Sequence, residues 1–326
     1  MKSVLVFKPG SIGDCLMAKY FLENVRNTHP EARYAVAVSV RVKMVRNLFA
    51  AYPWIEVIEA NRRSLWGLLR GGRHDFIVTP YTGGVFPLRS KIVARFLAST
   101  LIGYSDTSSF NRFLYNKVIP LVGRSRAPRL LECDALRALG LPVVVEKPTF
   151  NYLSQPGLLS RLGLQENKYV VVQLFSGSDA RGLSPERKRA LINVLGKILP
   201  VPLVLNGLPD EISKLSTLPA GVLGATTTLQ ELAHLIDHSA AMVSLDTGAA
   251  HIAAHLRKPL VVLASCIQAQ WWSESMYGKD ARTLFTCPEA CPHGHDYSGY
   301  AKCLDAIDVD AVAAQAARLL SVGTAR

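Results

Sequence analysis

Short apolar segments recur along the whole chain, and they constrain its fold more than any other feature. Each has three to five residues, mostly Val, Leu and Ala, and stretches of helical character separate them. Such runs are typical of parallel strands that are buried on both faces and joined by crossover helices. The segments are residues 4–7, 34–38, 76–78, 170–174, 203–205, 242–245 and 260–263. This pattern predicts an α/β fold.

A polar, Pro-bearing stretch separates the first three segments from the last four. It covers residues 148–157, and the next strand is expected to begin at Tyr169. With 326 residues, of which 49% are hydrophobic, the chain is long enough for two cores. We therefore predict two domains, residues 1–155 and residues 156–326.

The sequence lacks the marks of a membrane-spanning or secreted chain. No apolar stretch reaches the roughly 18–20 residues that a membrane-spanning helix needs. The first residues run directly into a strand segment, which is unlike a signal peptide. We expect a cytoplasmic protein whose thiols are mostly reduced.

The segment of residues 243–254 predicts a buried strand, a tight turn and a helix of small residues. Asp246 and Thr247 are suited to cap this helix, Gly248 allows close approach of a ligand, and His251 follows about one turn later. A helix N-terminus at the end of a strand is an anion site, best suited to a phosphate or diphosphate. The alternative is an ordinary strand-to-helix connection with a good N-cap.

The N-terminal segment repeats this plan. The strand of residues 3–7 leads into a Gly-rich turn at residues 8–14, and a helix is expected from Cys15. The turn matches neither the G-x-G-x-x-G spacing of dinucleotide folds nor the Lys-Ser/Thr ending of a P-loop.

Together these motifs resemble glycosyltransferase family 9, the ADP-heptose:lipopolysaccharide heptosyltransferases. The resemblance rests on the pair Gly13-Asp14 and on the Asp-Thr-Gly-x-x-His segment from Asp246 to His251. Between them, the strand of residues 170–174 leads to a Gly/Ser turn and the basic Arg181. The resemblance implies a GT-B fold, in which two Rossmann-like domains face a central cleft. It also implies that the last helix, residues 308–320, crosses back to the first domain.

The resemblance implies an inverting transfer of heptose from ADP-heptose that requires no metal or other cofactor. The acceptor would bind residues 1–155 and the nucleotide sugar residues 156–326. Asp14 would be the general base, although it could instead cap the following helix. The donor-binding residues would be Ser176, Ser178, Arg181, Glu211, Asp246, Thr247, Gly248 and His251. A solvated residue in a first helical turn is the alternative for Glu211, and a structural histidine is the alternative for His251.

One departure from the family leaves the donor open. The family's Lys-x-Trp-Pro after the middle strand is replaced by residues 181–184, Arg-Gly-Leu-Ser. Arg181 can still meet a phosphate with its fork of donors, but the aromatic residue is lost. A UDP- or GDP-hexose donor, a non-lipid acceptor, or a nucleotide-sugar-binding module without turnover are therefore the alternatives.

The positive charge lies entirely in the N-terminal half. Residues 1–150 contain 22 Lys and Arg against 10 Asp and Glu, which accounts for the whole formal net charge of +12. This charge suits an acidic acceptor, such as a phosphorylated or carboxylated glycolipid, and the resemblance implies one of the lipopolysaccharide-core type. Gly13, Arg62, Arg63 and Arg129 are the expected acceptor contacts. No nucleic-acid motif accompanies the charge, so we expect no nucleic-acid partner.

Two further features remain open from the sequence. Residues 61–73 mix Arg with Leu and Trp and could lie on the inner face of the cytoplasmic membrane, or pack on their own domain as an amphipathic helix. Cys287, Cys291, His295 and Cys303 lie within 17 residues, a density that suits zinc or iron, but their spacing is looser than that of a C-x₂-C pair. A reduced, irregular loop is the alternative, and we predict no metal.

Overall fold

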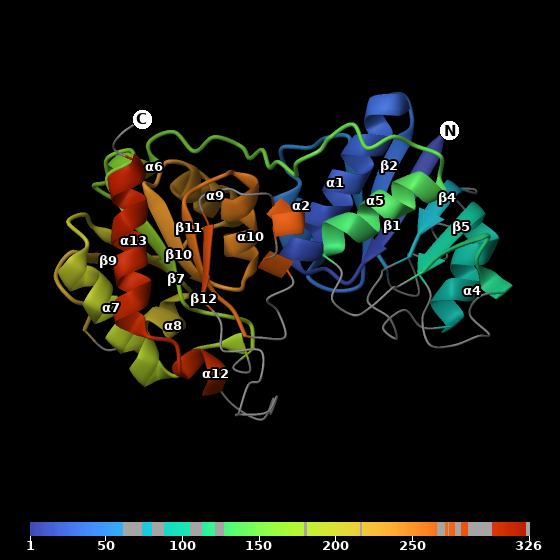
Figure 1. Ribbon diagram of the computed structural model, residues 1–326. Helices are drawn as coiled ribbons and strands as arrows, with labels where there is room; N and C mark the ends of the chain where they lie inside the picture. The colour runs from blue at the N-terminus through green and yellow to red at the C-terminus, as the bar shows by residue number, and fades with distance from the viewer. Residues whose placement is uncertain are drawn as a thin grey trace. The chain divides into compact units, whose positions relative to one another are not determined.

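The computed structural model describes residues 1–60, 74–79, 88–104, 113–120, 127–178, 181–215, 217–265, 271–272, 274–277, 282–285 and 302–323. The chain divides into two compact units, Met1–Thr149 and Phe150–Arg326 (Figure 1).

Within the described residues, unit 1 contains a six-stranded parallel sheet in the order β3-β2-β1-β4-β5-β6. The strands are β1 (Ser3–Lys8), β2 (Arg33–Val38), β3 (Ile55–Glu59), β4 (His74–Val78), β5 (Ala98–Tyr104) and β6 (Lys117–Ile119). The helices are α1 (Ile12–Thr28), α2 (Val42–Leu48), α4 (Leu88–Leu97) and α5 (Pro128–Ala138). All six residues of the central strand β1 are buried, as expected for a strand covered on both faces.

Unit 2 repeats this architecture, with a described sheet in the order β12-β11-β10-β7-β8-β9. The strands are β7 (Val170–Gln173), β8 (Leu203–Asn206), β9 (Val222–Ala225), β10 (Ala241–Leu245), β11 (Leu260–Leu263) and β12 (Arg282–Phe285). The helices are α6 (Leu158–Arg161), α7 (Pro185–Ile198), α8 (Pro209–Ser213), α9 (Leu229–Asp237), α10 (Gly248–His255), α11 (Glu274–Tyr277), α12 (Lys302–Asp305) and α13 (Val309–Gly323).

Both sheets reverse their direction of growth at one point. In unit 1 the chain builds outward from β1 to β3 and then continues on the other side with β4, so the reversal lies between β1 and β4. In unit 2 the equivalent reversal lies between β7 and β10. This is the strand order of a Rossmann-type sheet, which binds ligands beyond the carboxyl ends of the strands at the reversal.

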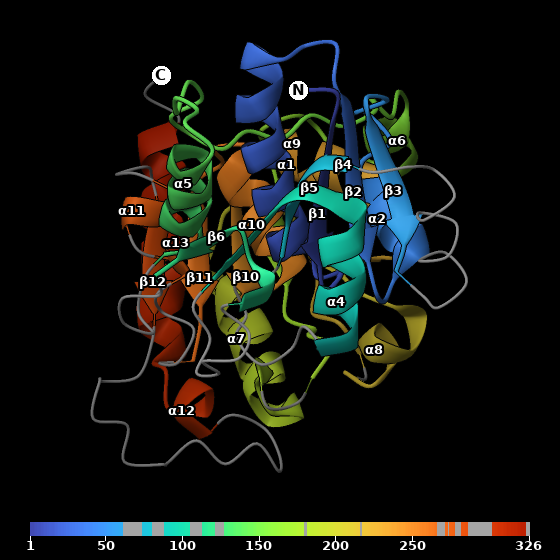
Figure 2. The same cartoon turned by 90° about the vertical axis from the view of Figure 1, so that its right-hand side faces the viewer.

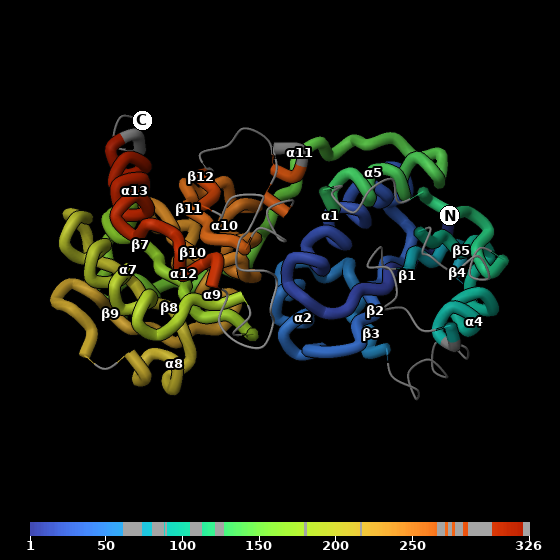
Figure 3. The backbone as a smooth tube through the Cα atoms, turned by 60° about the horizontal axis from the view of Figure 1, so that its bottom comes forward, coloured from blue at the N-terminus to red at the C-terminus, as the bar shows by residue number. Residues whose placement is uncertain are grey.

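Helix α13 packs against other elements of unit 2. It contacts α7 and the strands β10 and β11, and Figures 1 and 3 show it beside α7. Its buried residues Val312, Ala313 and Ala316 belong to the hydrophobic core of this unit. The helix predicted near residues 308–320 is therefore present, and it covers one face of its own sheet.

The predicted α/β class is confirmed, and every predicted apolar segment forms a strand. Five strands were not predicted: β3, β5, β6, β9 and β12. The first helix begins at Ile12, three residues before the predicted Cys15. None of the described helices is long and apolar enough to cross a membrane.

Candidate functional site

Apart from Glu211, which follows β8, the predicted donor residues follow the two strands at the reversal point of the unit 2 sheet. Residues 174–178 follow β7, and Asp246 and Thr247 follow β10, its neighbour in the sheet. The backbone N–H of Asp246 donates to the carbonyl of Leu263 at 3.0 Å, which extends the pairing of β10 with β11 beyond the last strand residue. The sheet thus brings two segments, about seventy residues apart in sequence, to one edge.

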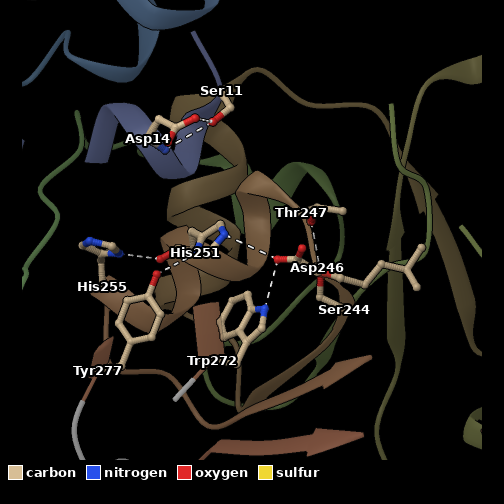
Figure 4. A network of polar contacts seen from close by, with 10 residues as sticks. Ser11, Asp14, Ser244, Asp246, Thr247, His251, His255, Trp272 and Tyr277 are labelled. Carbon is tan, nitrogen blue, oxygen red and sulfur yellow. Dashed lines mark hydrogen bonds and ion pairs between the residues drawn. The ribbon is translucent and has the colours of Figure 1, made fainter. Parts of the chain in front are cut away.

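Asp246 is buried within a network of polar and aromatic side chains (Figure 4). Its Oδ1 accepts a hydrogen bond from Trp272 Nε1 at 3.0 Å and lies 3.5 Å from His251 Nε2. His251 Nδ1 lies 2.6 Å from the hydroxyl of Tyr277. The rings of His251 and Trp272 stack with their centroids 4.6 Å apart. Because both ring nitrogens of His251 face protein groups, this geometry supports its structural alternative.

The prediction that Asp246 and Thr247 cap α10 is wrong. Thr247 occupies the N-cap position but makes no side-chain capping hydrogen bond, and its Oγ1 lies 3.3 Å from Ser244 Oγ. The carboxylate of Asp246 faces Trp272 and His251 instead. The first-turn N–H groups of α10, which begin at Gly248, therefore receive no cap from either predicted residue. Uncapped N–H groups and the helix dipole favour an anion at this end.

A pocket of about 140 Å³ lies in the same unit, beyond the carboxyl end of β7. Its lining residues are Phe175, Ser176, Gly182, Pro185, Lys188, Glu211, Lys214 and Leu215. Lys188 Nζ lies 5.5 Å from the centroid of the Phe175 ring. Two lysines, a hydroxyl, a carboxylate and an aromatic ring therefore line one pocket, a combination that suits a phosphorylated nucleoside. Lys188 and Lys214 could not be predicted as site residues from the sequence, since they lie outside the recognised motifs.

The predicted donor residues around this pocket differ in their surroundings. Ser176 lines the pocket, and its Oγ donates to the carbonyl of Ser178, which is itself exposed. Arg181 is also exposed, and its backbone N–H donates to the same carbonyl of Ser178 at 3.0 Å. Glu211 Oε2 accepts from the N–H of Leu208 at 2.8 Å, so this side chain caps the first turn of α8 and also lines the pocket.

Hydrogen bonds among the side chains of Gln173, Asn206 and Thr227 fix the edge of the sheet next to Phe175. Asn206 Nδ2 donates to Gln173 Oε1, and Thr227 Oγ1 donates to Asn206 Oδ1, both at 2.7 Å. A Cβ atom at Gly207 would lie 2.5 Å from the Phe175 ring, so only glycine fits beneath that ring. These contacts hold the floor of the pocket in one arrangement.

In unit 1, Asp14 lies at the equivalent reversal point, in the first turn of α1. Ser11 is the N-cap residue, and its Oγ accepts from the Asp14 N–H at 3.2 Å and donates to Asp14 Oδ2 at 2.5 Å (Figure 4). The alternative in which Asp14 itself caps the helix is therefore wrong. Gly10 has φ +108°, and a Cβ there would lie 2.3 Å from the Val40 carbonyl oxygen. Glycine is thus required for the turn that presents Asp14, and the neighbouring Gly13 is buried.

A buried ion pair lies near Asp14. Lys8, the last residue of β1, binds Glu132 of α5, and the two residues are 4% and 0% exposed. Burial raises the pKa of Glu132, the Lys8 ammonium lowers it, and the charge of Asp14 raises it. Glu132 Oε2 has no hydrogen-bond partner within the described part of the chain. The three charges therefore interact in a region that is largely closed to water.

Of the other predicted residues, the structure describes Arg129 and Cys303. Arg129 is half-buried, and its Nη1 donates to the carbonyl of Glu146. Cys303 is buried in the hydrophobic core of unit 2. Arg62, Arg63, Cys287, Cys291 and His295 lie outside the described residues. Among the residues that the structure does describe, no cluster of His, Cys, Asp and Glu could hold a metal ion.

The sequence is similar to that of known glycosyltransferases. Residues 209–270, which contain Glu211 and the Asp246–His251 segment, match the model of glycosyltransferase family 9 (heptosyltransferase). Over 229 residues the chain is 25% identical to the lipopolysaccharide heptosyltransferase 3 of Escherichia coli. The predicted resemblance to glycosyltransferase family 9 is confirmed. The match covers 65% of this chain and 66% of that relative.

Solved structures agree with the family 9 resemblance at the level of the fold. A family 9 glycosyltransferase from Veillonella parvula has a TM-score of 0.75 at 17% identity, with 98% of this chain and 97% of that one covered. The E. coli ADP-heptose heptosyltransferase II has a TM-score of 0.73 at 20% identity, with 99% and 100% covered. The predicted GT-B class, with two Rossmann-like units, is therefore confirmed. The placement of the two units across a cleft stays a prediction.

Proposed function

We propose that this chain is an inverting glycosyltransferase that transfers a heptose from ADP-heptose to an acidic glycolipid of the lipopolysaccharide-core type. The enzyme class follows from the family 9 resemblance, because the matched family and the matched E. coli relative are both glycosyltransferases. The observation that carries the finer proposal is the start of α10 at the reversal point of the unit 2 sheet, where the N-cap residue Thr247 makes no side-chain capping hydrogen bond. An anionic leaving group fits there.

The donor would bind to residues 156–326. Its diphosphate would accept hydrogen bonds from the N–H groups that begin at Gly248, with Arg181 and Lys188 as the nearby cations. Its nucleoside would occupy the pocket beside Phe175. Glu211 uses Oε2 to cap α8, and its Oε1 would accept from a ribose hydroxyl. Asp246 and His251 would shape this site through their contacts with Trp272 and Tyr277.

The proposed chemistry is a single displacement. Asp14 removes the proton from the acceptor hydroxyl as that oxygen attacks the anomeric carbon. The new C–O bond forms on the face opposite the leaving group, the bond from the anomeric carbon to the phosphate oxygen breaks, and ADP leaves with the electron pair. The dipole of α10 and Arg181 would stabilise the charge that develops on the diphosphate. The hydrogen bond from Ser11 orients the Asp14 carboxylate.

The acceptor would bind to residues 1–155 on the cytoplasmic side of a membrane. The basic excess of this half suits a phosphorylated or carboxylated glycolipid. We propose Gly13, Arg62, Arg63 and Arg129 as its contacts. Arg129 would contact the acceptor through its guanidinium group, one N–H of which donates to the carbonyl of Glu146.

Thermal unfolding with ADP, GDP and UDP, each added singly, tests the donor. Ligand at about 100 times its dissociation constant should stabilise the protein by about 2.7 kcal/mol. We expect a shift with ADP that is reduced in Lys188→Met and retained in the control Lys197→Met, an exposed lysine near the other end of α7. A shift with UDP or GDP alone would replace the donor, and no shift with any nucleotide would refute nucleotide-sugar binding.

Asp14→Asn separates catalysis from binding. The variant should keep the ADP-induced shift and lose about 10²–10⁴-fold in transfer rate. Transfer near the wild-type rate at saturating acceptor would exclude Asp14 as the base. A nucleotide shift without transfer by the wild-type protein, for every donor and acceptor pair assayed, would favour the non-catalytic binding module.

A further inference from the structure

Helix α4 of unit 1 exposes three of its apolar side chains to solvent. Leu88, Ile92 and Phe96 are 44%, 39% and 70% exposed. They occupy positions i, i+4 and i+8, so they form one stripe along the helix. We call these three side chains the α4 stripe. A helix on a protein surface ordinarily places its apolar stripe against the core and its polar face in water.

Other residues attach α4 to the sheet, so the α4 stripe is not needed for packing. Ala94 and Leu97 are buried in the core formed with β1, β2, β4 and β5. Lys91 is only 4% exposed, and its Nζ lies 5.9 Å from the centroid of the Tyr115 ring. The helix therefore buries a lysine while it exposes Leu, Ile and Phe. Figure 2 views the molecule from the side on which α4 lies.

The charge of the helix indicates what this surface binds. The sequence of α4, LRSKIVARFL, has three basic residues and no acidic one. Arg95 lies seven residues after Leu88, and two helical turns place it beside the stripe. The formal excess of +12 belongs to the same half of the chain. Exposed apolar residues next to arginine, on a helix without carboxylates, are typical of helices that lie in the surface of an anionic bilayer.

We propose that α4 binds the surface of a membrane that contains anionic lipids, with the α4 stripe among the acyl chains and Arg95 at the phosphates. The proposal deepens the proposed function and rests on it in one respect, because a glycolipid acceptor requires an enzyme that works at a membrane surface. The same stripe could instead pair two copies of the chain. Charge argues against that arrangement, since two α4 helices would bring like charges together without a carboxylate between them.

Vesicle co-sedimentation tests the proposal in the absence of nucleotide and acceptor. The vesicles are phosphatidylcholine alone and phosphatidylcholine with an equal amount of phosphatidylglycerol. The variants are Ile92→Ser and Ile92→Ser/Phe96→Ser, and the matched control is Ile198→Ser at the end of α7 in unit 2. Ile92 and Ile198 have nearly the same exposure, 39% and 43%. Because these side chains are partly exposed already, both substitutions should leave the fold intact, which the unfolding temperature checks.

We expect the wild-type protein to partition onto the phosphatidylglycerol vesicles and to be released by salt. The double variant should partition at least about tenfold more weakly than the wild type. Ile198→Ser should partition like the wild type. Wild-type protein that stays in the supernatant, or a double variant that binds equally well, would overturn the proposal. The proposal would also be overturned if the wild-type protein were a dimer that Ile92→Ser/Phe96→Ser dissociates, and if none of the proteins bound the vesicles. The ADP-induced shift, measured on the same proteins, reports the proposed donor site separately.

Discussion

The buried ion pair between Lys8 and Glu132 allows a quantitative test of how unit 1 is held together. Lys8 ends the central strand β1, and Glu132 lies on α5, which packs against α1. The two side chains are 2% and 0% exposed, so removing one partner leaves a charge with little access to water. Such a loss costs about 3–5 kcal/mol, whereas replacing both partners by apolar residues is often neutral or stabilising.

The two single variants should differ in their dependence on pH. In Lys8→Met, the cause that lowers the pKa of Glu132 is removed, while burial and Asp14 continue to raise it above the ordinary 4.5. The folded state then binds a proton more tightly than the unfolded state, so stability rises as the pH falls toward 4.5. In Glu132→Leu the buried charged group that remains of the pair is the Lys8 ammonium, and acid does not neutralise it. Its cost should therefore persist across that pH window.

The assay is a double-mutant cycle with Lys8→Met, Glu132→Leu and the pair. Because the chain forms two compact units, a whole-molecule transition would mix two unfolding reactions. Hydrogen exchange of β1 and β7 peptides as a function of urea reports each unit separately. We expect each single variant to lose about 3–5 kcal/mol in unit 1 at pH 7, and the double variant to recover most of that loss. Additive single effects, or equal losses in β7, would refute the reasoning.

Three further outcomes are expected. In Gly207→Ala the new methyl group displaces the Phe175 ring, so the affinity for ADP should fall by about tenfold and the ADP-induced shift in unfolding temperature should shrink. The far-UV circular dichroism spectrum should not change. Burial and the charge of His238 lower the pKa of His234, so the unfolded state binds more protons below about pH 6.5, and acid should destabilise unit 2 less in His234→Gln. Burial raises the pKa of the Cys15 thiol, so mass spectrometry should find its peptide alkylated by iodoacetamide in urea and unmodified in native protein.

The strands that sequence reasoning found and those it missed differ in their surroundings. Inner strands such as β1 and β10 are buried at every position and have four consecutive or nearly consecutive apolar residues. The edge strand β3 has the sequence Ile-Glu-Val-Ile-Glu, in which both Glu side chains are exposed, and its short apolar stretches did not predict a strand. Strand β5 begins at Ala98, directly after α4 ends at Leu97, with no Gly or Pro to mark the change. Local composition therefore fails where tertiary pairing decides the conformation.

In the candidate site too, local structure could be predicted from the sequence and contacts between distant segments could not. A strand, a tight turn and a small-residue helix could be predicted from residues 243–254, because each depends on neighbours in sequence. The direction of the Asp246 carboxylate could not, because its hydrogen-bond donor Trp272 lies on another segment and, with His251, competes for it with the helix N-terminus. That competition matters for function. A side-chain cap would have satisfied an amide of α10, whereas the Asp246 carboxylate is held by an indole N–H instead. The departure from ordinary capping therefore supports an anion site at this position more strongly than the capping motif itself would have done.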